Sequence, residues 1–460
     1  MSGADYIWNR GQSSAKQLDN PRVALVHYWY VRRRGGERVL DVMADMFPSA
    51  DIFTLFHSPT ELSDSVKRHK ISSSFLNRLP GVRRYYRMLM PFLPIALEQL
   101  PLNDYDLVIS HEAGPAKGVL TRSDACHICY CHSPMRYLWD MYQEYLATAP
   151  FGPLGKAFYA LSSHYMRGWD YASSTRVDHF AASSRNSARR IHKYYGRSAQ
   201  VIYPPVNVSD FSIGDSTADF YLVVSPLVQY KRIDLAIRAC NQLRARLIII
   251  GQGEQSAALR KLAGPTISFL GFQADEVVRS HYRSCRALLF PGEEDIGLTP
   301  IEAQASGRPV IAYARGGALE SVLGVFPGEV ADSAAHTGVF FEQQSVDSLV
   351  DALRAFESME HRFSPRFIRT HAKEFDATHF KRNFAEFVAA KWREFSSGLS
   401  RESLPESHES SSARRNSVSP EGSDFRERTP SQPAIKDGTP VVPSTARNSV
   451  SGRTRTEMEV

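Results

Sequence analysis

The sequence predicts an α/β protein made of two doubly wound parallel sheets, followed by a tail without a core of its own. Short apolar, strand-like runs alternate with amphipathic helical patterns along most of the chain, which is typical of parallel sheets covered by helices on both faces. The alternation is interrupted by a double proline within residues 201–208 and then restarts, which indicates two domains. From about residue 397 the composition becomes rich in serine, proline and charge.

The first half of the chain begins with polar residues 1–20, which we expect to be flexible. Strand candidates then follow at 22–29, 50–56, 105–111, 126–132 and 177–184. A loop with two adjacent glycines, within "RRRGGERVL", follows the first candidate and leads into an amphipathic helix. Residues 21–204 are therefore predicted to form the first domain.

The second half repeats the alternation of strand candidates and helical patterns. Its strand candidates are 220–226, 245–253, 267–272, 286–292 and 309–317, with a helical pattern over 232–243. Residues 205–375 are predicted to form the second domain, and a helix over 376–396 closes the ordered part. Residues 397–460 contain too few large apolar side chains to offset chain entropy, so we expect them to be disordered.

Charge and cysteine content restrict the classes of partner and compartment. The chain has 460 residues, a formal net charge of +6 and a pI of about 9.0. This modest basic excess suits anionic ligands or a membrane surface. The sequence contains no groove-reading motif, so nucleic acid is not a predicted partner. Five cysteines in so long a chain argue against a disulfide framework, and no signal peptide or spanning segment is evident, so we expect a cytoplasmic protein.

One segment within the first domain has two interpretations that the sequence leaves open. Residues 77–97, "NRLPGVRRYYRMLMPFLPIAL", mix arginines with aromatic and apolar residues. They suit a peripheral contact with the anionic inner face of the cell membrane, which would bring the protein to a lipid-linked acceptor. They equally suit an amphipathic helix pair that covers the first domain.

The stretch "EEDIGLTPIEAQASGRPV", residues 293–310, also has two interpretations. Thr299, Pro300 and Glu302 fit a helix start in which Thr299 is the N-cap and Glu302 closes a capping box. That interpretation leaves Glu294 and Gly297 unexplained. In open α/β sheets, ligands bind where strands end and helices begin, and this loop follows a strand candidate.

Other strand ends of the second half carry cations and glycines. Lys231 and Arg232 stand where a strand gives way to a helix, and either cation suits a diphosphate. The amides of Gly297, Leu298 and Thr299 lie at another helix start on the same predicted sheet edge. We therefore expect a polar crevice for a nucleotide diphosphate, in which Glu294 and Glu302 accept hydrogen bonds from sugar hydroxyls.

These motifs resemble the donor site of retaining glycosyltransferases of family 4, which have the GT-B architecture of two Rossmann-like domains facing a cleft. The resemblance rests on Glu294 and Glu302 in E-x7-E, with "YKRIDLAI", "IIIGQGE", "FLGF" and "GGALESV" in the expected order. In the first half, "GGERVL" and "YCHSPMRYLWD" match best the mannosyltransferase-like branch. The resemblance covers about residues 22–396.

The resemblance also implies roles for individual residues. Lys231, with Arg232 beside it, binds the donor diphosphate, and Glu294 contacts the hydroxyls of the transferred sugar. The remaining implied donor-site residues are Glu302 for the ribose, Gly297, Leu298 and Thr299 for the phosphates, and Gly35 and Gly36 for close approach of the first domain. His132 lies near the reacting sugar, with Arg136 a turn later. Pro226 replaces an arginine that many relatives carry, and Arg232 is the candidate to compensate.

Metal sites are weakly supported. "CHICYCH", residues 126–132, has five ligand-type side chains, but strand alternation would place them on opposite faces. The only Asp-x-Asp, residues 104–106, has no neighbouring ligand set. Because Lys231, Arg232 and loop amides can stabilise a leaving diphosphate, we predict transfer without a metal or other cofactor.

The predicted function is thus transfer of a sugar, with GDP-mannose as the first donor candidate, to a growing glycan or lipid-linked acceptor in polysaccharide biosynthesis. Two alternatives remain. A nucleotide-sugar epimerase of the same architecture would use acid–base residues and need no acceptor. A non-catalytic nucleotide-sugar-binding protein would fit the loss of arginine at Pro226. No G-x-G-x-x-G follows the first strand, which argues against a dinucleotide dehydrogenase.

Overall fold

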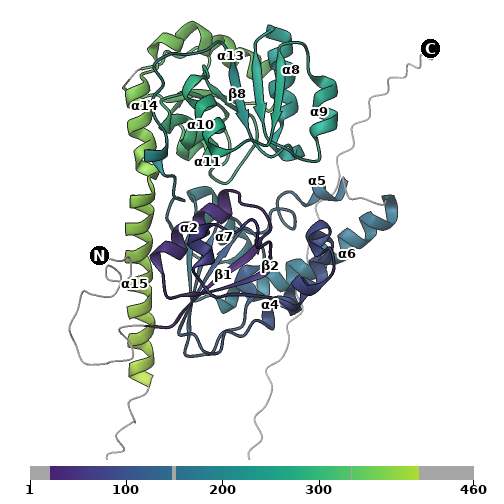
Figure 1. The fold of residues 1–460 in the computed structure, drawn as a ribbon, viewed down its shortest axis with the longest axis vertical. Helices are drawn as coiled ribbons and strands as arrows, with labels where there is room; N and C mark the ends of the chain where they lie inside the picture. Colours follow the sequence, from purple (N-terminus) through teal and green to yellow (C-terminus); the bar gives the residue numbers. More distant parts are fainter. Residues whose placement is uncertain (1–20, 148–151, 333, 403–460) are drawn as a thin grey trace, which may run out of the picture. The chain divides into compact units, whose positions relative to one another are not determined.

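The computed structural model describes residues 21–147, 152–332 and 334–402, which form two sheets of seven strands each (Figure 1). The strand pairs in both sheets are parallel, and helices cover both faces of each sheet. The predicted fold class of two doubly wound α/β domains is confirmed. The segment predicted to be flexible, residues 1–20, and residues 403–460 of the predicted tail lie outside the described residues.

The first sheet has the order β3-β2-β1-β4-β5-β6-β7. Its strands are β1 (Val23–Tyr30), β2 (Asp51–His57), β3 (Ile71–Ser73), β4 (Leu107–Glu112), β5 (Cys126–Cys131), β6 (His179–Ala182) and β7 (Ala199–Val201). The sequence order reverses between β1 and β4, so the loops after these two strands diverge and leave room for a ligand at their carboxyl ends.

The second sheet repeats this topology with the order β10-β9-β8-β11-β12-β14-β13. Its strands are β8 (Tyr221–Val224), β9 (Leu247–Ile250), β10 (Ile267–Gly271), β11 (Leu288–Phe290), β12 (Val310–Tyr313), β13 (Gly324–Val325) and β14 (Gly338–Phe341). Here the order reverses between β8 and β11. The loops after these two strands contain Lys231 and Glu294, so topology alone places the two residues near each other.

Four strands were not predicted. β3 and β7 have three residues each and read "ISS" and "AQV", so neither contains an apolar run. β13 has two residues, and β14, "GVFF", follows a polar loop. Strands this short are specified by pairing with a neighbour rather than by local pattern. The double proline lies in the linker between the sheets, where Val206 pairs with Phe375 and Ala377 through backbone hydrogen bonds.

Helices bury the two faces of each sheet. In the second sheet, α8 (Ile233–Leu243), α9 (Ser256–Leu262) and α13 (Val346–Met359) share one apolar cluster with the strands. α10 (Asp275–Ser284), α11 (Leu298–Ala305) and α14 (Pro365–Ala372) lie in another. In the first sheet, α4 (Leu93–Glu98) packs on the face opposite α2 (Gly35–Met46).

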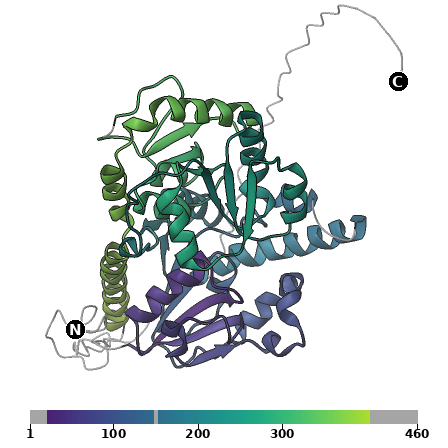
Figure 2. The same cartoon turned by 45° about the horizontal axis from the view of Figure 1, so that its top comes forward.

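The last helix, α15 (Ala377–Glu402), returns to the first sheet and lies beside α2 (Figures 1 and 2). Phe380, Phe384 and Trp392 enter the same buried cluster as Ile128 and Tyr130 of β5. Helix α15 extends past its predicted end at residue 396. The chain thus leaves the first domain, builds the second, and comes back to complete the core of the first.

The segment 77–97 does not form the amphipathic helix pair considered above. It consists mainly of 3-10 turns, over Phe75–Arg78, Val82–Arg84 and Tyr86–Phe92, before α4 begins at Leu93. Pro80, Pro91 and Pro94 lack the N–H that a continuous helix needs, so only short turns form. Within the described residues, every helix is too short or too polar to span a bilayer.

Truncating the core contribution of α15 tests its structural role. Phe384 is fully buried, so Phe384→Ala should lower the free energy of unfolding by about 3–5 kcal/mol, because the ring contacts are lost and a cavity remains. Urea denaturation followed by tryptophan fluorescence measures the change. Phe158→Ala, at a phenylalanine that is 55% exposed, is the matched control and should change stability by less than about 1 kcal/mol.

Candidate donor site

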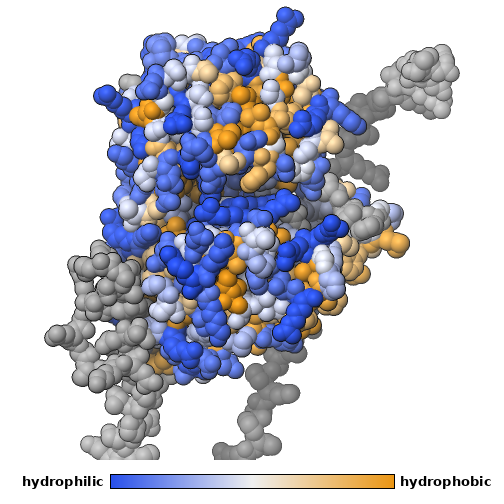
Figure 3. Space-filling view, in the orientation of Figure 1, coloured by the Kyte–Doolittle hydropathy of each residue, from blue (hydrophilic) through white to orange (hydrophobic). Residues whose placement is uncertain are grey.

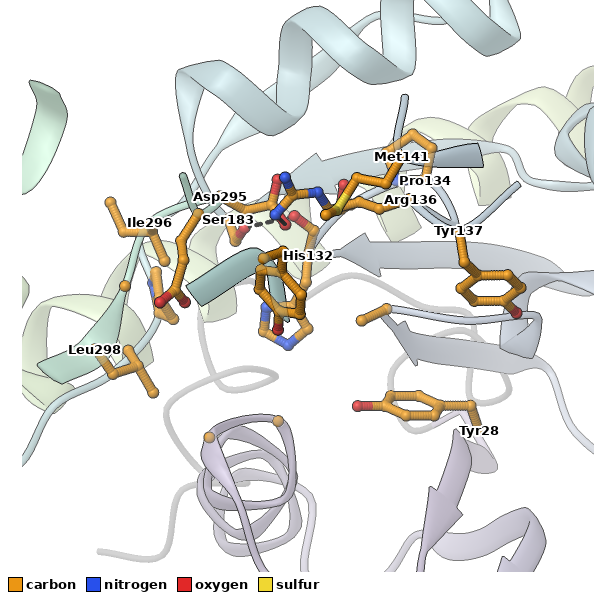
Figure 4. A pocket seen from close by; sticks show the side chains of 18 of the residues that line it. Tyr28, His132, Pro134, Arg136, Tyr137, Met141, Ser183, Asp295, Ile296 and Leu298 are labelled. Atoms are coloured by element: carbon orange, nitrogen blue, oxygen red, sulfur yellow. Dashed lines mark hydrogen bonds and ion pairs between the residues drawn. The ribbon is translucent and has the colours of Figure 1, made fainter. Parts of the chain in front are cut away.

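A cavity of about 310 Å³ lies where the carboxyl ends of strands from both sheets meet (Figure 4). Three segments supply much of its wall: the start of α2, residues 132–137 after β5, and residues 294–298 after β11. Of the residues predicted for the site, the cavity wall contains Gly35, Gly36, His132, Glu294, Gly297 and Leu298. Lys231 contacts one of these residues, whereas Arg232, Thr299 and Glu302 lie outside the wall.

The two glycines at the start of α2 are required by close packing. A Cβ atom on Gly35 would lie 2.9 Å from Leu298 Cδ1, across the cavity mouth in the second domain. A Cβ atom on Gly36 would lie 2.8 Å from the hydroxyl of Tyr28. Glu37 accepts a hydrogen bond from the Arg34 amide at 2.9 Å, which fixes the first turn. The N-terminus of this twelve-residue helix therefore reaches the cavity without a side chain of its own at its first two positions.

Lys231 and Glu294 form an ion pair at the wall. Lys231 ends a 3-10 turn after β8, and Glu294 follows β11, so the pair joins the two loops at the reversal of strand order. Burial lowers the pKa of Lys231, but the Glu294 carboxylate outweighs it and the net shift is upward. Lys231 therefore keeps its charge. Gly292 permits this contact, because a Cβ atom there would lie 2.8 Å from Lys231 Cα.

Helix α11 starts two residues earlier than the capping interpretation requires. Its first residue is Leu298 and its N-cap is Gly297, whose φ of 76° favours glycine. The prediction of Thr299 as N-cap is therefore wrong, and Glu302 lies too far into the helix to close a capping box. A Cβ atom on Gly297 would lie 2.6 Å from the Phe290 ring, so the loop can turn here only with glycine.

Glu302 faces the first domain rather than the cavity. Its Oε1 accepts a hydrogen bond from Arg38 of α2 at 3.1 Å, and its Oε2 accepts one from the Tyr282 hydroxyl at 3.0 Å. Arg38 also pairs with Asp275 at 2.7 Å. Burial raises the pKa of Glu302, although Arg38 and Tyr282 oppose the shift. Glu302 thus has no helix-capping role and links α11 to α2.

Arg232 turns away from Lys231. Its guanidinium donates to both oxygens of Asp234, at 3.1 and 3.2 Å, and to Gln344 at 3.1 Å. It lines a neighbouring cavity of about 670 Å³, which shares Arg136, Met141 and Tyr230 with the first cavity. In this arrangement the guanidinium of Arg232 does not replace an arginine at Pro226.

Arg136 lines the cavity wall, and Arg190 of α7 (Arg185–Tyr195) contacts the same loop of the second domain. Arg136 donates to the Glu293 carbonyl at 3.1 Å, and Arg190 pairs with Asp295 and, at 3.2 Å, with Glu293. The two arginines therefore hold the loop on either side of Glu294. Arg190 could not be identified from the sequence, because its helix, "RNSARRIHKYY", has the pattern of a solvated basic surface.

His132 follows β5 and lies on the wall (Figure 4). Its carbonyl accepts hydrogen bonds from the hydroxyls of Ser183, at 3.0 Å, and Ser187. Burial lowers the pKa of His132 to about 3, with a further contribution from His27. His132 is therefore neutral at neutral pH, and it can exchange hydrogen bonds with a hydroxyl without bringing a charge.

The cysteines next to His132 belong to the core. The thiol of Cys126 packs in the cluster that contains α2 and α15, whereas Cys129 and Cys131 pack in the cluster on the opposite face. Burial raises the pKa of Cys126 to about 12. Among the residues that the structure describes, three or more His, Cys, Asp or Glu side chains do not gather with metal-binding geometry.

Two family profiles match consecutive parts of the chain. The profile described as "Glycosyltransferase Family 4" matches residues 33–210, and "Glycosyl transferases group 1" matches residues 210–374. Together they span most of the described residues and every strand of the two sheets except β1. The two matches support a family 4 glycosyltransferase. The more specific mannosyltransferase-like branch has no such support.

Curated relatives match this chain over part of their length. The glycogen synthase of Xanthomonas campestris is 29% identical over 215 residues, which cover 44% of this chain and 42% of that protein. The D-inositol 3-phosphate glycosyltransferase of Geodermatophilus obscurus is 28% identical over 238 residues, or 39% of this chain and 53% of that protein. The chain thus spans about half or less of the length of these relatives.

Solved structures share the architecture. Anabaena HepE in complex with UDP-glucose has a TM-score of 0.57 and 16% identity, covering 80% of this chain and 99% of that one. Sucrose-phosphate synthase from Thermosynechococcus elongatus has a TM-score of 0.55 and 16% identity, covering 84% of this chain and 100% of that one. At this identity the likeness establishes the GT-B fold.

The Arg38–Glu302 contact makes stability depend on pH. A raised pKa means that the native state binds more protons than the unfolded chain just above pH 4.5, so burial of Glu302 costs stability as pH rises. Arg38→Ala should increase this cost. Because the Arg38 side chain is 39% exposed and screened by water, we expect a loss of about 1–2 kcal/mol at neutral pH and less at about pH 5.

Urea denaturation at the two pH values measures this loss. Arg32→Ala, at an exposed arginine in the loop that precedes α2, is the control and should be neutral at both pH values. An equal effect of Arg38→Ala at both pH values would contradict the assignment to Glu302.

Proposed function

We propose that this chain is a retaining glycosyltransferase that moves a sugar from a nucleotide diphosphate donor to a growing glycan or lipid-linked acceptor in polysaccharide biosynthesis. The observation that carries the proposal is the Lys231–Glu294 ion pair at the wall of a cavity that two helix N-termini approach. A cation, a carboxylate and two sets of amides are the groups that a diphosphate joined to a sugar requires.

The diphosphate binds between the starts of α2 and α11. Helix N-termini attract anions because their first amides lack helical partners and their dipoles are positive there. Gly35 and Gly36 on one side, and Gly297 and Leu298 on the other, present backbone to the cavity. Lys231 exchanges the Glu294 carboxylate for a phosphate oxygen, and Thr299 supports the same turn. Arg232 takes part only if it leaves Asp234.

The carboxylates and His132 then act on the sugars. Release of Lys231 frees Glu294 to accept hydrogen bonds from hydroxyls of the transferred sugar. Glu302 accepts from the ribose once Arg38 moves aside. As the glycosidic bond breaks, charge develops on the leaving diphosphate, where Lys231 and the amides stabilise it without a metal. His132 forms a hydrogen bond with a hydroxyl of the reacting sugar.

Donor choice is tested by nucleotide release. The sequence motifs favour GDP-mannose as donor. In contrast, the curated relatives include glycogen synthases, and one of the similar solved structures is a complex with UDP-glucose. The full chain is incubated with GDP-mannose, UDP-glucose or ADP-glucose, with lipid extract as acceptor and with or without chelator. Release that persists with chelator supports metal-independent transfer. An epimerised donor without release supports the epimerase, and a thermal shift without turnover supports a non-catalytic binder.

Lys231→Met should lower kcat by about 30- to 1000-fold, because on the order of 2–4 kcal/mol of leaving-group stabilisation is lost. The measurement is steady-state nucleotide release. Lys381→Met, at an exposed lysine of α15, is the control and should leave kcat unchanged. If Lys231→Met retains full kcat, Lys231 does not stabilise the leaving group.

An exposed apolar surface of the first domain supports membrane contact. On α6 (Gly152–Ser173), Leu154 is 84% exposed and Leu161 is 74% exposed, and orange surface lies over this helix in Figure 3. Helix α6 contacts the 3-10 turn Tyr86–Phe92, whose Met88 and Phe92 are also exposed. Arg78, Arg83 and Arg84 are exposed nearby in sequence. Apolar side chains flanked by arginines suit the surface of an anionic bilayer.

The double variant Leu154→Glu/Leu161→Glu should reduce binding to phosphatidylserine-containing vesicles by at least about tenfold, because two apolar side chains become anionic. Vesicle sedimentation of the full chain measures the bound fraction. The matched control is Val330→Glu, at a residue that is 65% exposed in the second domain. Unchanged sedimentation of the double variant would remove α6 from the membrane contact.

A further inference from the structure

Three histidines form a continuous line from the cavity into the core of the first domain. His132 Nε2 lies 2.6 Å from His111 Nε2, and His111 Nδ1 lies 3.0 Å from His27 Nδ1. His27 Nε2 in turn lies 3.9 Å from Oε1 of Glu37. The line thus joins a residue on the cavity wall to a carboxylate in the first turn of α2.

The sheet builds this line from three neighbouring strands. His27 of β1 and His111 of β4 are register partners, and their rings stack with centroids 5.0 Å apart. His132 follows β5, the strand beside β4, and its ring meets His111 edge-on at 4.6 Å. His27 is 0% exposed, His111 1% and Glu37 3%. Inner members of the line therefore exchange hydrogen bonds with one another rather than with bulk water.

Each close N–N contact holds one proton, so neutral rings can be ordered in only two ways. Either every ring donates toward Glu37, or every ring donates toward the cavity. In the second order a nitrogen lone pair of His27 faces the Glu37 carboxylate, which is unfavourable. In the first order His27 presents Nε2–H to that carboxylate, so the two opposite partial charges attract.

We propose that Glu37, His27 and His111 act as a positioning relay that fixes the tautomer of His132, with Nε2–H donated to His111 and Nδ1 left as the acceptor. The proposed order is Nε2–H on His132, Nδ1–H on His111 and Nε2–H on His27. His132 can then accept a hydrogen bond from a sugar hydroxyl through Nδ1. This consequence rests on the proposed function, whereas the order of the protons does not.

The surroundings of the line favour neutral rings. Burial lowers the pKa of His111 and of His132, and the neighbouring histidines contribute in the same direction. Tyr30 and Tyr130 also pack against the rings, and burial is the main cause that raises the pKa of each phenol, so both stay uncharged at neutral pH. Glu37 is then the carboxylate that sets the direction of the line.

The tautomers can be observed directly. Nitrogen-15 NMR of the full chain labelled at histidine distinguishes Nδ1–H from Nε2–H rings without any donor or acceptor. We expect the order stated above in the unaltered protein. We expect mixed tautomers in Glu37→Gln, because the neutral amide can accept from Arg34 yet attracts His27 less. The reverse order in the unaltered protein, or an unchanged order in Glu37→Gln, overturns the proposal.

Two further variants keep the test decisive. Glu98→Gln alters a carboxylate of the same domain that bonds to Trp169 and Arg176, and it should leave the histidine order unchanged. If Glu37→Gln fails to fold, His27→Phe serves instead. This variant removes the imidazole that faces Glu37 and should leave His111 and His132 as mixtures of tautomers. A fixed order in His27→Phe also overturns the proposal.

Kinetics separates this relay from a structural role. Glu37→Gln should lower kcat on the order of tenfold with an unchanged KM for the donor, and it should shift the acidic limb of the pH profile to lower pH, because the rings lose a stabilising anion when protonated. An unshifted limb overturns the catalytic part of the proposal. If the NMR order is found but no donor is turned over, the relay stands and the proposed function fails.

Discussion

The site depends on the pairing of one largely buried cation with one largely buried anion. Lys231 and Glu294 come from the two loops at which the strand order of the second sheet reverses, so topology forces both toward one place. A charge in such a place must be paired, since an uncompensated buried ion costs several kcal/mol. Each member is therefore available to a ligand only when the ligand supplies a replacement. A diphosphate joined to a sugar supplies an anion for the lysine and hydroxyls for the carboxylate.

The contacts between the two halves also pair groups that a ligand could use only by replacing the existing partner. Arg38 reaches from α2 to Glu302, Arg190 pairs with Asp295, and the start of α7 donates to Glu320 at 2.7 and 2.8 Å. Each contact uses a carboxylate of the second domain and a donor of the first. A ligand that takes over Glu302 must loosen one of these contacts. Under the proposed function, ligand binding at Glu302 would therefore be linked to the contacts between the two halves.

The sequence predicted the parts of this arrangement that local pattern controls. The alternation of apolar runs and helices predicted the fold class, and the motifs that contain Gly35, Gly36 and Glu294 predicted part of the cavity wall. The directions of the side chains could not be predicted from the sequence. Arg232 and Lys231 are neighbours in sequence, yet the positive φ of Arg232, 51°, sends its side chain to Asp234. Thr299 had good capping chemistry, but Gly297 could adopt a turn that a Cβ atom would block.

Contacts between distant segments were also out of reach. His27, His111 and His132 are far apart in sequence and sit in unremarkable strand patterns, and only strand order places their rings in line. Arg38 and Glu302 are separated by 264 residues. The sequence of helix α15 predicts only a helix that closes the chain. Its return to the first sheet depends on the apolar surface of that sheet, against which its aromatic side chains pack.

The pairing of each of these cations with a carboxylate is also relevant to the absence of an arginine at the position of Pro226. Lys231 is held by Glu294, Arg190 by Asp295 and Glu293, and Arg232 by Asp234. An additional free cation would attract anions without discrimination, whereas paired cations become available only to a ligand that also satisfies the carboxylates. A free phosphate offers charge but no sugar hydroxyls for Glu294. Under the proposed function, the arrangement would therefore favour a complete nucleotide sugar over its inorganic fragments, because only the complete donor compensates both members of the Lys231–Glu294 pair.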